Sequence, residues 1–297
     1  MKPLTITGGV TRLKCLYQYG CVGIFSGFSF LKLARRMKTT RLIRRLPLVA
    51  DWLKECYEIV LKSLYAKRGM PIAVGNDLFR VAVESRTMVS SYEGEQAVYD
   101  AMARLAGDRM TVFDIGANEG LFTLCAARRV GSGGRVVCFE PAPEALKLLR
   151  QNICLNGFQN RVDVVGKLVA DRCGWERFYV EGKSGYNSQS KEAAPRNADP
   201  IQVETVSIDA FVEATRRPPD VVKIDVEGAE LRVLQGMEAA LTRGDIFVLC
   251  EIHPACLGFF HASERDIVAF MERIGFGIYD MRMHRLTALQ QHVIFAK

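Results

Sequence analysis

The sequence lacks the cysteine spacings that are typical of zinc-binding and disulfide-rich proteins. No Cys-x-x-Cys pair occurs, and the number of cysteines, nine, is odd. Structural zinc sites use closely spaced cysteines, and disulfide-stapled domains use an even number of them. Several of the nine fall within apolar segments, where a thiol packs as a small hydrophobic side chain. We therefore expect reduced thiols and a cytoplasmic protein.

The sequence also lacks a long apolar run. The uncharged segment 15–31 has 17 residues, three of them glycine, which is at the lower limit for a transmembrane helix. A cleaved signal peptide is disfavoured because no small-residue cleavage site follows, and seven Lys and Arg residues lie between Lys32 and Arg45. We expect neither a membrane span nor a signal peptide.

Acidic residues are scarce in the first part of the chain. Residues 1–70 carry 14 of the 40 Lys and Arg residues but only 3 of the 33 Asp and Glu residues, so the net charge of +7 originates there. Residues 71–297 have a small acidic excess, which disfavours binding of nucleic acid, because such binding needs cations to neutralise phosphates. We interpret residues 1–70 as a basic helical extension of a domain that spans 71–297.

Two amphipathic patterns occupy this extension. Residues 31–46 combine apolar residues with seven cations and no anion, and Pro47 ends the pattern. Residues 49–64 repeat apolar side chains at steps of three and four. Two interpretations remain open: both helices pack on the main domain and expose a basic face, or residues 31–46 lie peripherally on an anionic membrane surface.

The pattern beyond residue 70 predicts an α/β fold. Residues 71–108 lead in with a hairpin, since 71–74 and 78–84 flank Gly75-Asn76-Asp77, and with a helix at 93–105. From 109 to 297 strands and helices alternate. The predicted strands are 111–115, 135–140, 161–165, 175–181, 220–225, 245–252, 277–280 and 291–296. The predicted helices are 120–129, 143–155, 207–214, 227–242 and 263–274. This alternation predicts a largely parallel sheet with helices on both faces.

Four of the predicted strands have an acidic residue at their last or second-to-last position. These residues are Asp114, Glu140, Asp225 and Glu251. Ligands of parallel α/β sheets bind beyond the carboxyl ends of the strands. One acid in such a position is compatible with a helix cap, whereas four in series favour a binding site.

The segment TVFDIGANEG, 111–120, lacks both glycine-rich phosphate fingerprints. Neither GxxxxGK[ST] nor GxGxxG occurs, and the spacing is Gly116-xxx-Gly120. A carboxylate at Asp114 repels a pyrophosphate but suits a cationic ligand, and an acid at Glu140 can accept the hydroxyls of a ribose. A ligand with a cationic end and a ribose but no pyrophosphate is S-adenosylmethionine. The alternative is a tight turn followed by two helix-capping acids.

At these segments the sequence resembles a known family. VFDIGANEG, FEPAPEALKLLRQNICLNGF, VVKIDVEGAELRVLQG and CEIHP are similar to the FkbM family of S-adenosylmethionine-dependent methyltransferases, and the resemblance covers residues 71–297. It implies a Rossmann-like class I methyltransferase fold, with a seven-stranded, mostly parallel sheet whose last strand is antiparallel. It also implies O-methylation of a hydroxylated acceptor such as a sugar, glycolipid or polyketide.

The resemblance assigns six residues to the cofactor. They are Asp114, Gly116, Asn118, Gly120, Glu140 and Asp171. The first four match the loop around the methionine end, Glu140 matches the acid that binds the ribose, and Asp171 matches, less closely, the position near the adenine.

Methyl transfer to a hydroxyl needs an aligned nucleophile and a group that removes its proton. Asp225 and Glu227 leave one predicted strand, and His253 leaves the next. Imidazole suits a base near neutral pH, so His253 or Asp225 is the predicted base, with Glu227 orienting the acceptor. The alternative is that Asp225 and Glu227 cap the following helix and Lys223 is a paired structural charge.

A divalent metal is an alternative that the sequence does not favour. Asp225, Glu227, Glu251 and His253 offer carboxylate and imidazole ligands for Mg²⁺ or Mn²⁺, but acidic pairs at helix starts are common without a metal. The remaining histidines, at 261, 284 and 292, show no ligand spacing.

The polar segment 182–200 is predicted to be a loop, either an acceptor-binding lid that uses Tyr186, Asn187 and Ser188 or plain disorder.

Two other functions are alternatives. N-methylation of a nucleic-acid base commonly uses Asn-Pro-Pro-aromatic after the fourth strand, where this chain has Asp225-Val226-Glu227-Gly228. A non-catalytic, membrane-associated module would keep the basic extension and would not need the cofactor set from Asp114 to Glu140. The intact set favours an enzyme.

Overall fold

The computed structural model describes residues 47–180, 191 and 199–297. The chain divides into two compact units, Met1–Arg86 and Thr87–Lys297. The predicted basic helix at 31–46 lies outside the described residues, as do residues 186–188. The boundary expected at residue 70 stays a prediction. Within the described part of the chain, no helix is both long and apolar enough to cross a bilayer.

The first unit contains a helix and a hairpin. Helix α3 (Pro47–Tyr65) precedes β1 (Met70–Val74) and β2 (Asp77–Val81), which pair antiparallel as predicted. Gly75 adopts a φ of 57° in the turn, a conformation that glycine reaches without steric cost. The side chains of Arg86 and Glu58 form an ion pair that joins α3 to the residues after the hairpin.

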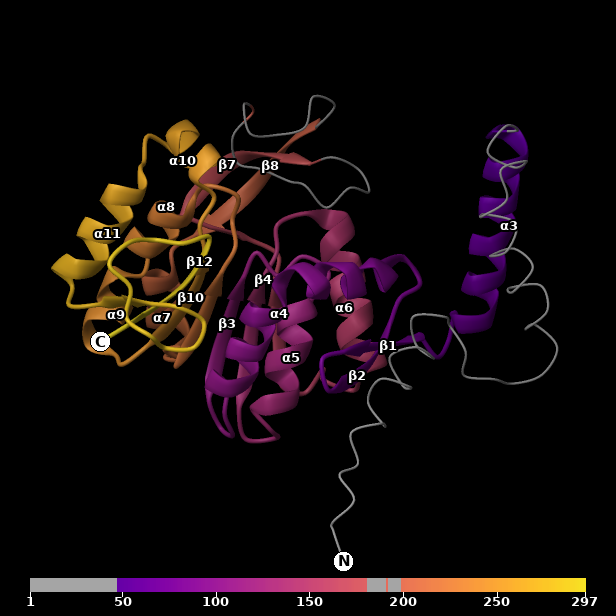
Figure 1. The fold of residues 1–297 in the computed structure, drawn as a ribbon, viewed down its shortest axis with the longest axis horizontal. Coiled ribbons are helices and arrows are strands. Elements are labelled where there is room, and N and C mark those ends of the chain that lie inside the picture. The colour runs from indigo at the N-terminus through magenta and orange to yellow at the C-terminus, as the bar shows by residue number, and fades with distance from the viewer. Residues whose placement is uncertain (1–46, 181–190, 192–198) are drawn as a thin grey trace, which may run out of the picture. The chain divides into compact units, whose positions relative to one another are not determined.

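The second unit is built on a seven-stranded sheet (Figure 1). Its strand order is β11-β12-β10-β9-β3-β4-β5, and every strand is parallel except β12, which confirms the expected topology. The bounds are β3 Thr111–Ile115, β4 Arg135–Phe139, β5 Val162–Val165, β9 Val221–Ile224, β10 Phe247–Glu251, β11 Gly277–Tyr279 and β12 His292–Ala296.

Helices cover both faces of this sheet. They are α4 Met88–Leu105, α5 Leu121–Arg129, α6 Pro143–Leu155, α7 Ile208–Thr215, α8 Glu230–Gln235, α9 Glu238–Arg243, α10 Pro254–Leu257 and α11 Glu264–Arg273. The alternation along β3 shows the two faces: Asp114 points to α5, where it meets Thr123, while Phe113 and Ile115 join a core with α7, α8, α9 and α11.

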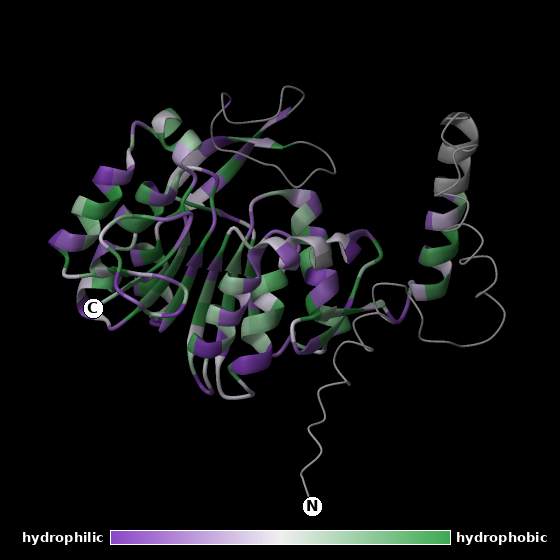
Figure 2. Ribbon diagram, viewed as in Figure 1, coloured by the Kyte–Doolittle hydropathy of each residue, from purple (hydrophilic) through white to green (hydrophobic). Residues whose placement is uncertain are grey.

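Burial on both faces explains the strand sequences. All four residues of β9 are buried, and Figure 2 shows the central strands as mainly hydrophobic. Parallel strands that are covered on both faces read as continuous apolar runs, and this pattern made them predictable.

A second, three-stranded sheet was not predicted. It consists of β6 (Leu168–Val169), β8 (Asp199–Val206) and β7 (Gly174–Val180), in that order. The predicted loop 182–200 is therefore wrong at its end, where Asp199 and Pro200 begin β8. Phe178 and Val203 of this sheet pack on Ala145 of α6, so contacts distant in sequence stabilise it.

The predicted helix 227–242 is also wrong, because two short helices replace it. The chain turns at Gly236 and Met237, between α8 and α9, and the carboxylate of Asp209 accepts hydrogen bonds from the backbone N–H groups of Ala239 and Ala240 at 2.9 and 2.8 Å. A side chain from α7 thus satisfies the free N–H groups that a new helix start creates.

Replacing Asp209 with Ala should lower the free energy of unfolding by about 2 kcal/mol, because α9 loses a charged cap. Urea denaturation would measure the loss. The matched control is Glu213→Ala, an exposed position on the same helix, which should change stability by less than about 0.5 kcal/mol. Equal losses in the two variants would contradict the capping role of Asp209.

Candidate active site

The register of the sheet brings the predicted site residues to one edge. Ile115 of β3 lies opposite Phe139 of β4 and Ile224 of β9. The residues that follow these strands, Glu140 and Asp225, therefore leave the sheet at the same level. Glu251 ends β10, the next strand along.

The loop after β3 is held in a left-handed conformation. The φ angles are 80° at Gly116, 48° at Asn118 and 97° at Gly120. A Cβ atom on Gly116 would lie 1.9 Å from the carbonyl oxygen of Asp225, and one on Gly120 would lie 2.6 Å from Leu149 Cδ1. The two glycines thus allow the loop backbone to lie close to other parts of the protein. Gly116 lets the loop lie directly against the end of β9, and its expected contact with a cofactor stays a prediction.

Asp114 carries a buried acceptor atom without a partner. Its carboxylate is 1% exposed, Thr123 Oγ1 donates to Oδ2 at 2.5 Å, and Oδ1 has no hydrogen bond among the described residues. Burial raises the pKa of Asp114, and the nearby ammonium of Lys223 opposes that rise. An orphaned carboxylate oxygen in this position suits a cationic or N–H-bearing ligand, as the methionine end of the expected cofactor is.

Glu140 ties the β3 loop to β4. Its Oε2 accepts a hydrogen bond from the Asn118 N–H and its Oε1 accepts one from the Ala142 N–H, both at 2.8 Å. Burial raises the pKa of Glu140 to about 7, although both N–H donors favour the ionised form. Each carboxylate oxygen can accept a second hydrogen bond, so the expected contact with ribose hydroxyls remains available.

Asp171 lies in an ion-pair group away from this loop. Its Oδ1 accepts hydrogen bonds from Arg232 Nε at 2.8 Å and Nη2 at 2.6 Å, and the same guanidinium pairs with Glu176. Arg232 lowers the pKa of Asp171 against the effect of burial. The structure gives Asp171 a structural partner, and its role near the adenine stays a prediction.

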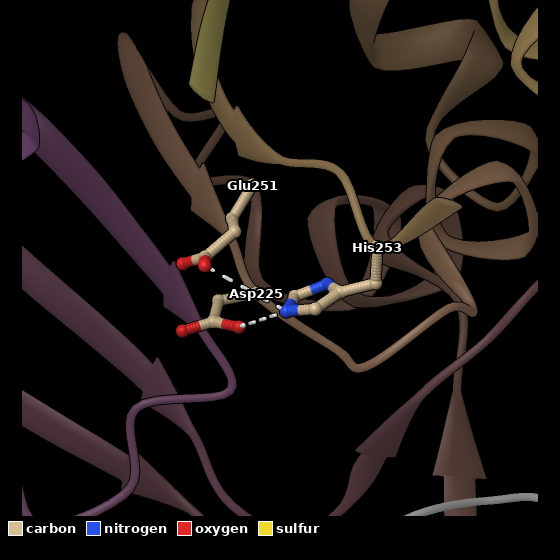
Figure 3. Close-up of side chains that lie close together, drawn as sticks. All are labelled: Asp225, Glu251 and His253. Atoms are coloured by element: carbon tan, nitrogen blue, oxygen red, sulfur yellow. Dashed lines mark ion pairs between the residues drawn. The ribbon is translucent and has the colours of Figure 1, made fainter. Parts of the chain in front are cut away.

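The second part of the site surrounds His253. Its Nδ1 lies 2.8 Å from Oε1 of Glu230, a fully buried side chain. Its Nε2 faces three further carboxylates, at 3.5 Å from Glu227 Oε2, 3.7 Å from Glu251 Oε1 and 3.8 Å from Asp225 Oδ1. Figure 3 shows this nitrogen between Asp225 and Glu251. Each of these two carboxylates and the imidazole offers one atom within 4.8 Å of the others, a spacing that ligands of one metal ion can have.

The carboxylates raise the pKa of His253 to about 9. Burial lowers it, but the hydrogen bond to Glu230 and the charges of Glu227 and Asp225 outweigh that effect. In these surroundings the imidazole is protonated at neutral pH. A role as general base therefore requires a bound group that displaces the proton.

Lys223 is a paired structural charge, as one interpretation expected. Its side chain is 2% exposed, and Nζ lies 2.7 Å from Asp225 Oδ2 and 4.6 Å from the centre of the Phe122 ring. The capping role considered for Asp225 and Glu227 is absent from the described residues, since α8 begins at Glu230 and its N-cap, Ala229, has no side-chain hydrogen bond.

Sequence reasoning missed three residues beside this group. Glu95 lies at a kink of α4, where its φ of −115° and ψ of 20° are not helical; burial raises its pKa to about 7. His292 Nε2 lies 3.4 Å from Glu251 Oε1, and Gln291 donates a hydrogen bond to the same oxygen at 3.2 Å. The kink of α4 brings Glu95 to this group, and strand β12 brings His292 and Gln291. No local spacing in the sequence indicates either contact.

The His253–Glu230 contact can be tested by titration. In NMR spectra of histidine-labelled, chelator-treated protein, the His253 imidazole should titrate near pH 9, well above its usual 6.5, because Glu230 stabilises the charged form. Glu230→Gln should shift the midpoint back toward 6.5. His253→Gln assigns the signal among the four histidines of the chain. A midpoint near 6.5 in the unaltered protein would contradict this electrostatic description.

Comparison with known proteins now gives the site a context. The family model described as "Methyltransferase FkbM domain" matches residues 114–278, more than half of the chain and the whole set from Asp114 to His253. The chain belongs to the FkbM methyltransferase family.

Two curated relatives are each less than one third identical to the chain over the matched residues. The hexuronic acid methyltransferase AglP of Haloferax volcanii is 28% identical over 224 residues, which are 71% of this chain and 83% of the relative. The 31-O-demethyl-FK506 methyltransferase FkbM of Streptomyces tacrolimicus is 29% identical over 215 residues, which are 63% and 80%. A solved FkbM methyltransferase from Methylobacillus flagellatus matches with a TM-score of 0.40 and 14% identity, covering 84% of this chain and 60% of that one.

Proposed function

We propose that this FkbM-family, S-adenosylmethionine-dependent methyltransferase methylates a hydroxyl of a sugar or of a related hydroxylated small molecule. One observation carries the proposal. Asp114, whose Oδ1 has no partner among the described residues, lies at the carboxyl end of β3. The acid–imidazole group around His253 includes Asp225, which follows the neighbouring strand β9 at the same edge of the sheet. A site for a cationic donor and a group that handles a proton are thereby adjacent.

The residues of the β3 loop fit the cofactor. Asp114 offers a buried, unpartnered oxygen for a positively charged amine, and Glu140 keeps acceptor capacity for ribose hydroxyls. Gly116 and Gly120 adopt the left-handed conformations of the loop that follows Asp114, and Asn118 in this loop donates its N–H to Glu140. S-adenosylmethionine supplies an electrophilic methyl group when it is bound. The chain's own residues position the cofactor and balance its positive charge.

Asp225, Glu227 and His253 are the proposed catalytic residues. One carboxylate oxygen of Asp225 and one of Glu227 lie within 4 Å of His253 Nε2. Such a group can orient an acceptor hydroxyl and take up its proton as the new bond to carbon forms. Lys223 Nζ lies 2.7 Å from Asp225 Oδ2 and holds this side chain in place.

The relatives favour a hydroxylated acceptor. One is named for a sugar acid, hexuronic acid, and the other for an O-demethyl form of FK506. The excess of carboxylates around His253 agrees with an acceptor that binds through hydroxyl groups, because an anion placed directly there would be repelled.

The cofactor site has a direct test. Calorimetry should show binding of S-adenosylmethionine to the full chain. Asp114→Asn should weaken it at least 10-fold, because a neutral amide cannot balance the positive charge. Glu140→Gln should weaken binding by a similar factor, because the amide is a poorer acceptor for the ribose hydroxyls. Glu213→Gln, at an exposed position, should bind normally. No binding by the unaltered protein, or equal binding by all four proteins, would refute the proposal.

The acceptor chemistry has a separate test. Labelled S-adenosylmethionine and a cell extract, with mass analysis of the labelled product, would identify an acceptor. With that acceptor, His253→Gln and Asp225→Asn should lower kcat by roughly 10²- to 10⁴-fold, which is the usual contribution of acid–base groups. Affinity for the cofactor should stay within about twofold. An unchanged kcat in His253→Gln would remove His253 from the catalytic set.

A further inference from the structure

We propose that Asp225, Glu251 and His253 form a binding site for one divalent cation of the Mg²⁺ or Mn²⁺ type, which would hold the acceptor's hydroxyl oxygen. This proposal deepens the proposed function and rests on it for the role of the cation, while the binding itself can be tested alone. Three features of the group support it.

The first feature is the spacing of the ligand atoms. His253 Nε2 lies 3.7 Å from Glu251 Oε1 and 3.8 Å from Asp225 Oδ1, too far for a hydrogen bond to either. Atoms that each lie about 2.1 Å from one ion are roughly 3 to 4 Å apart. His253 Nε2 thus forms ion-pair contacts but no hydrogen bond with the two carboxylates, and Figure 3 shows the three side chains converging from two adjacent strand ends.

The second feature is the support of the imidazole. Glu230 is fully buried, and its Oε1 lies 2.8 Å from His253 Nδ1 and also accepts the Gly228 N–H at 2.9 Å. Its Oε2 is buried without a hydrogen bond among the described residues. Metal-binding histidines commonly donate their second N–H to a carboxylate, which fixes the ring and directs the other nitrogen at the metal. Glu230 holds His253 in this way.

The third feature is the charge. Four carboxylates lie within 4 Å of the His253 ring: Asp225, Glu227, Glu230 and Glu251. Lys223 pairs with Asp225 through Oδ2, which leaves Oδ1 facing the centre of the group. Crowded carboxylates repel one another, and a divalent cation between them would remove that repulsion.

The donor set indicates the kind of metal. Two carboxylates and one imidazole form an oxygen-rich set that suits Mg²⁺ or Mn²⁺, and three protein ligands leave positions for water or substrate. A hydroxyl bound to a divalent cation loses its proton more easily than a free one. The cation would thus position the acceptor's oxygen at the end of β9, next to the β3 loop.

Binding of Mn²⁺ by the full chain tests the proposal, measured by electron paramagnetic resonance without S-adenosylmethionine. One Mn²⁺ should bind, and Asp225→Asn and Glu251→Gln should each weaken binding at least 10-fold. Glu230→Gln, a positioning variant, should weaken it roughly 10- to 100-fold. The control is Asp163→Asn, a partly exposed acid on β5 that pairs with Arg217.

A measurement on the unaltered protein guards against misfolded variants. Added Mn²⁺ should broaden the NMR signal of His253 more than that of His284, an exposed histidine paired with Asp280. Uniform broadening, or binding that Asp225→Asn and Asp163→Asn retain equally, would overturn the metal site. Calorimetry with S-adenosylmethionine on the same samples separates the two proposals: cofactor binding without Mn²⁺ binding refutes the metal alone, and Mn²⁺ binding without cofactor binding refutes the methyltransferase site.

Discussion

The site depends on the ion pair between the buried ammonium of Lys223 and Asp225. Lys223 lies on β9 directly opposite Asp114 of β3, and its Nζ contacts Asp225 at 2.7 Å. A buried charge without a partner is strongly destabilising, so the ammonium of Lys223 needs acidic side chains beside it. The proposed function assigns Asp114 to a cofactor half of the site and Asp225 to an acceptor half. One cation therefore joins the two halves electrostatically, and the sheet fixes the distance between them.

The glycines of the β3 loop make the same connection sterically. Gly116 lets the loop lie against the carbonyl oxygen of Asp225, where any side chain would collide with it. Beyond that carbonyl, Glu227 adopts a φ of 52° and Gly228 packs on Cys256 of α10. A non-glycine residue in the left-handed region costs about 1 kcal/mol or more and persists only where its surroundings impose it. The turn that carries Glu227 is thus held between β3 and α10, and this packing directs its side chain toward His253.

Much of this arrangement could be predicted from local sequence. Strands buried on both faces read as apolar runs, and an acid at the end of each run marks the edge where parallel strands open. Strand β8, the break between α8 and α9, and the kink at Glu95 could not be predicted in this way. The first two depend on distant partners: Phe178 packs with Val203, and Asp209 caps α9 from another helix. His292 reaches Glu251 only because β12 inserts antiparallel beside β10, and no spacing in the sequence indicates that contact.

The imidazole of His253 shows why strand-end acids alone do not define the chemistry. Its residue type suggests a base near neutral pH, but its neighbours raise its pKa to about 9. Glu230 occupies Nδ1, so any ligand must interact through Nε2, and the carboxylates of Asp225, Glu227 and Glu251 already face that nitrogen. A proton or a metal ion can satisfy this arrangement, and both bind the same lone pair. They consequently compete, and the outcome of that competition would decide whether His253 acts as an acid–base group or as a metal ligand in the proposed reaction.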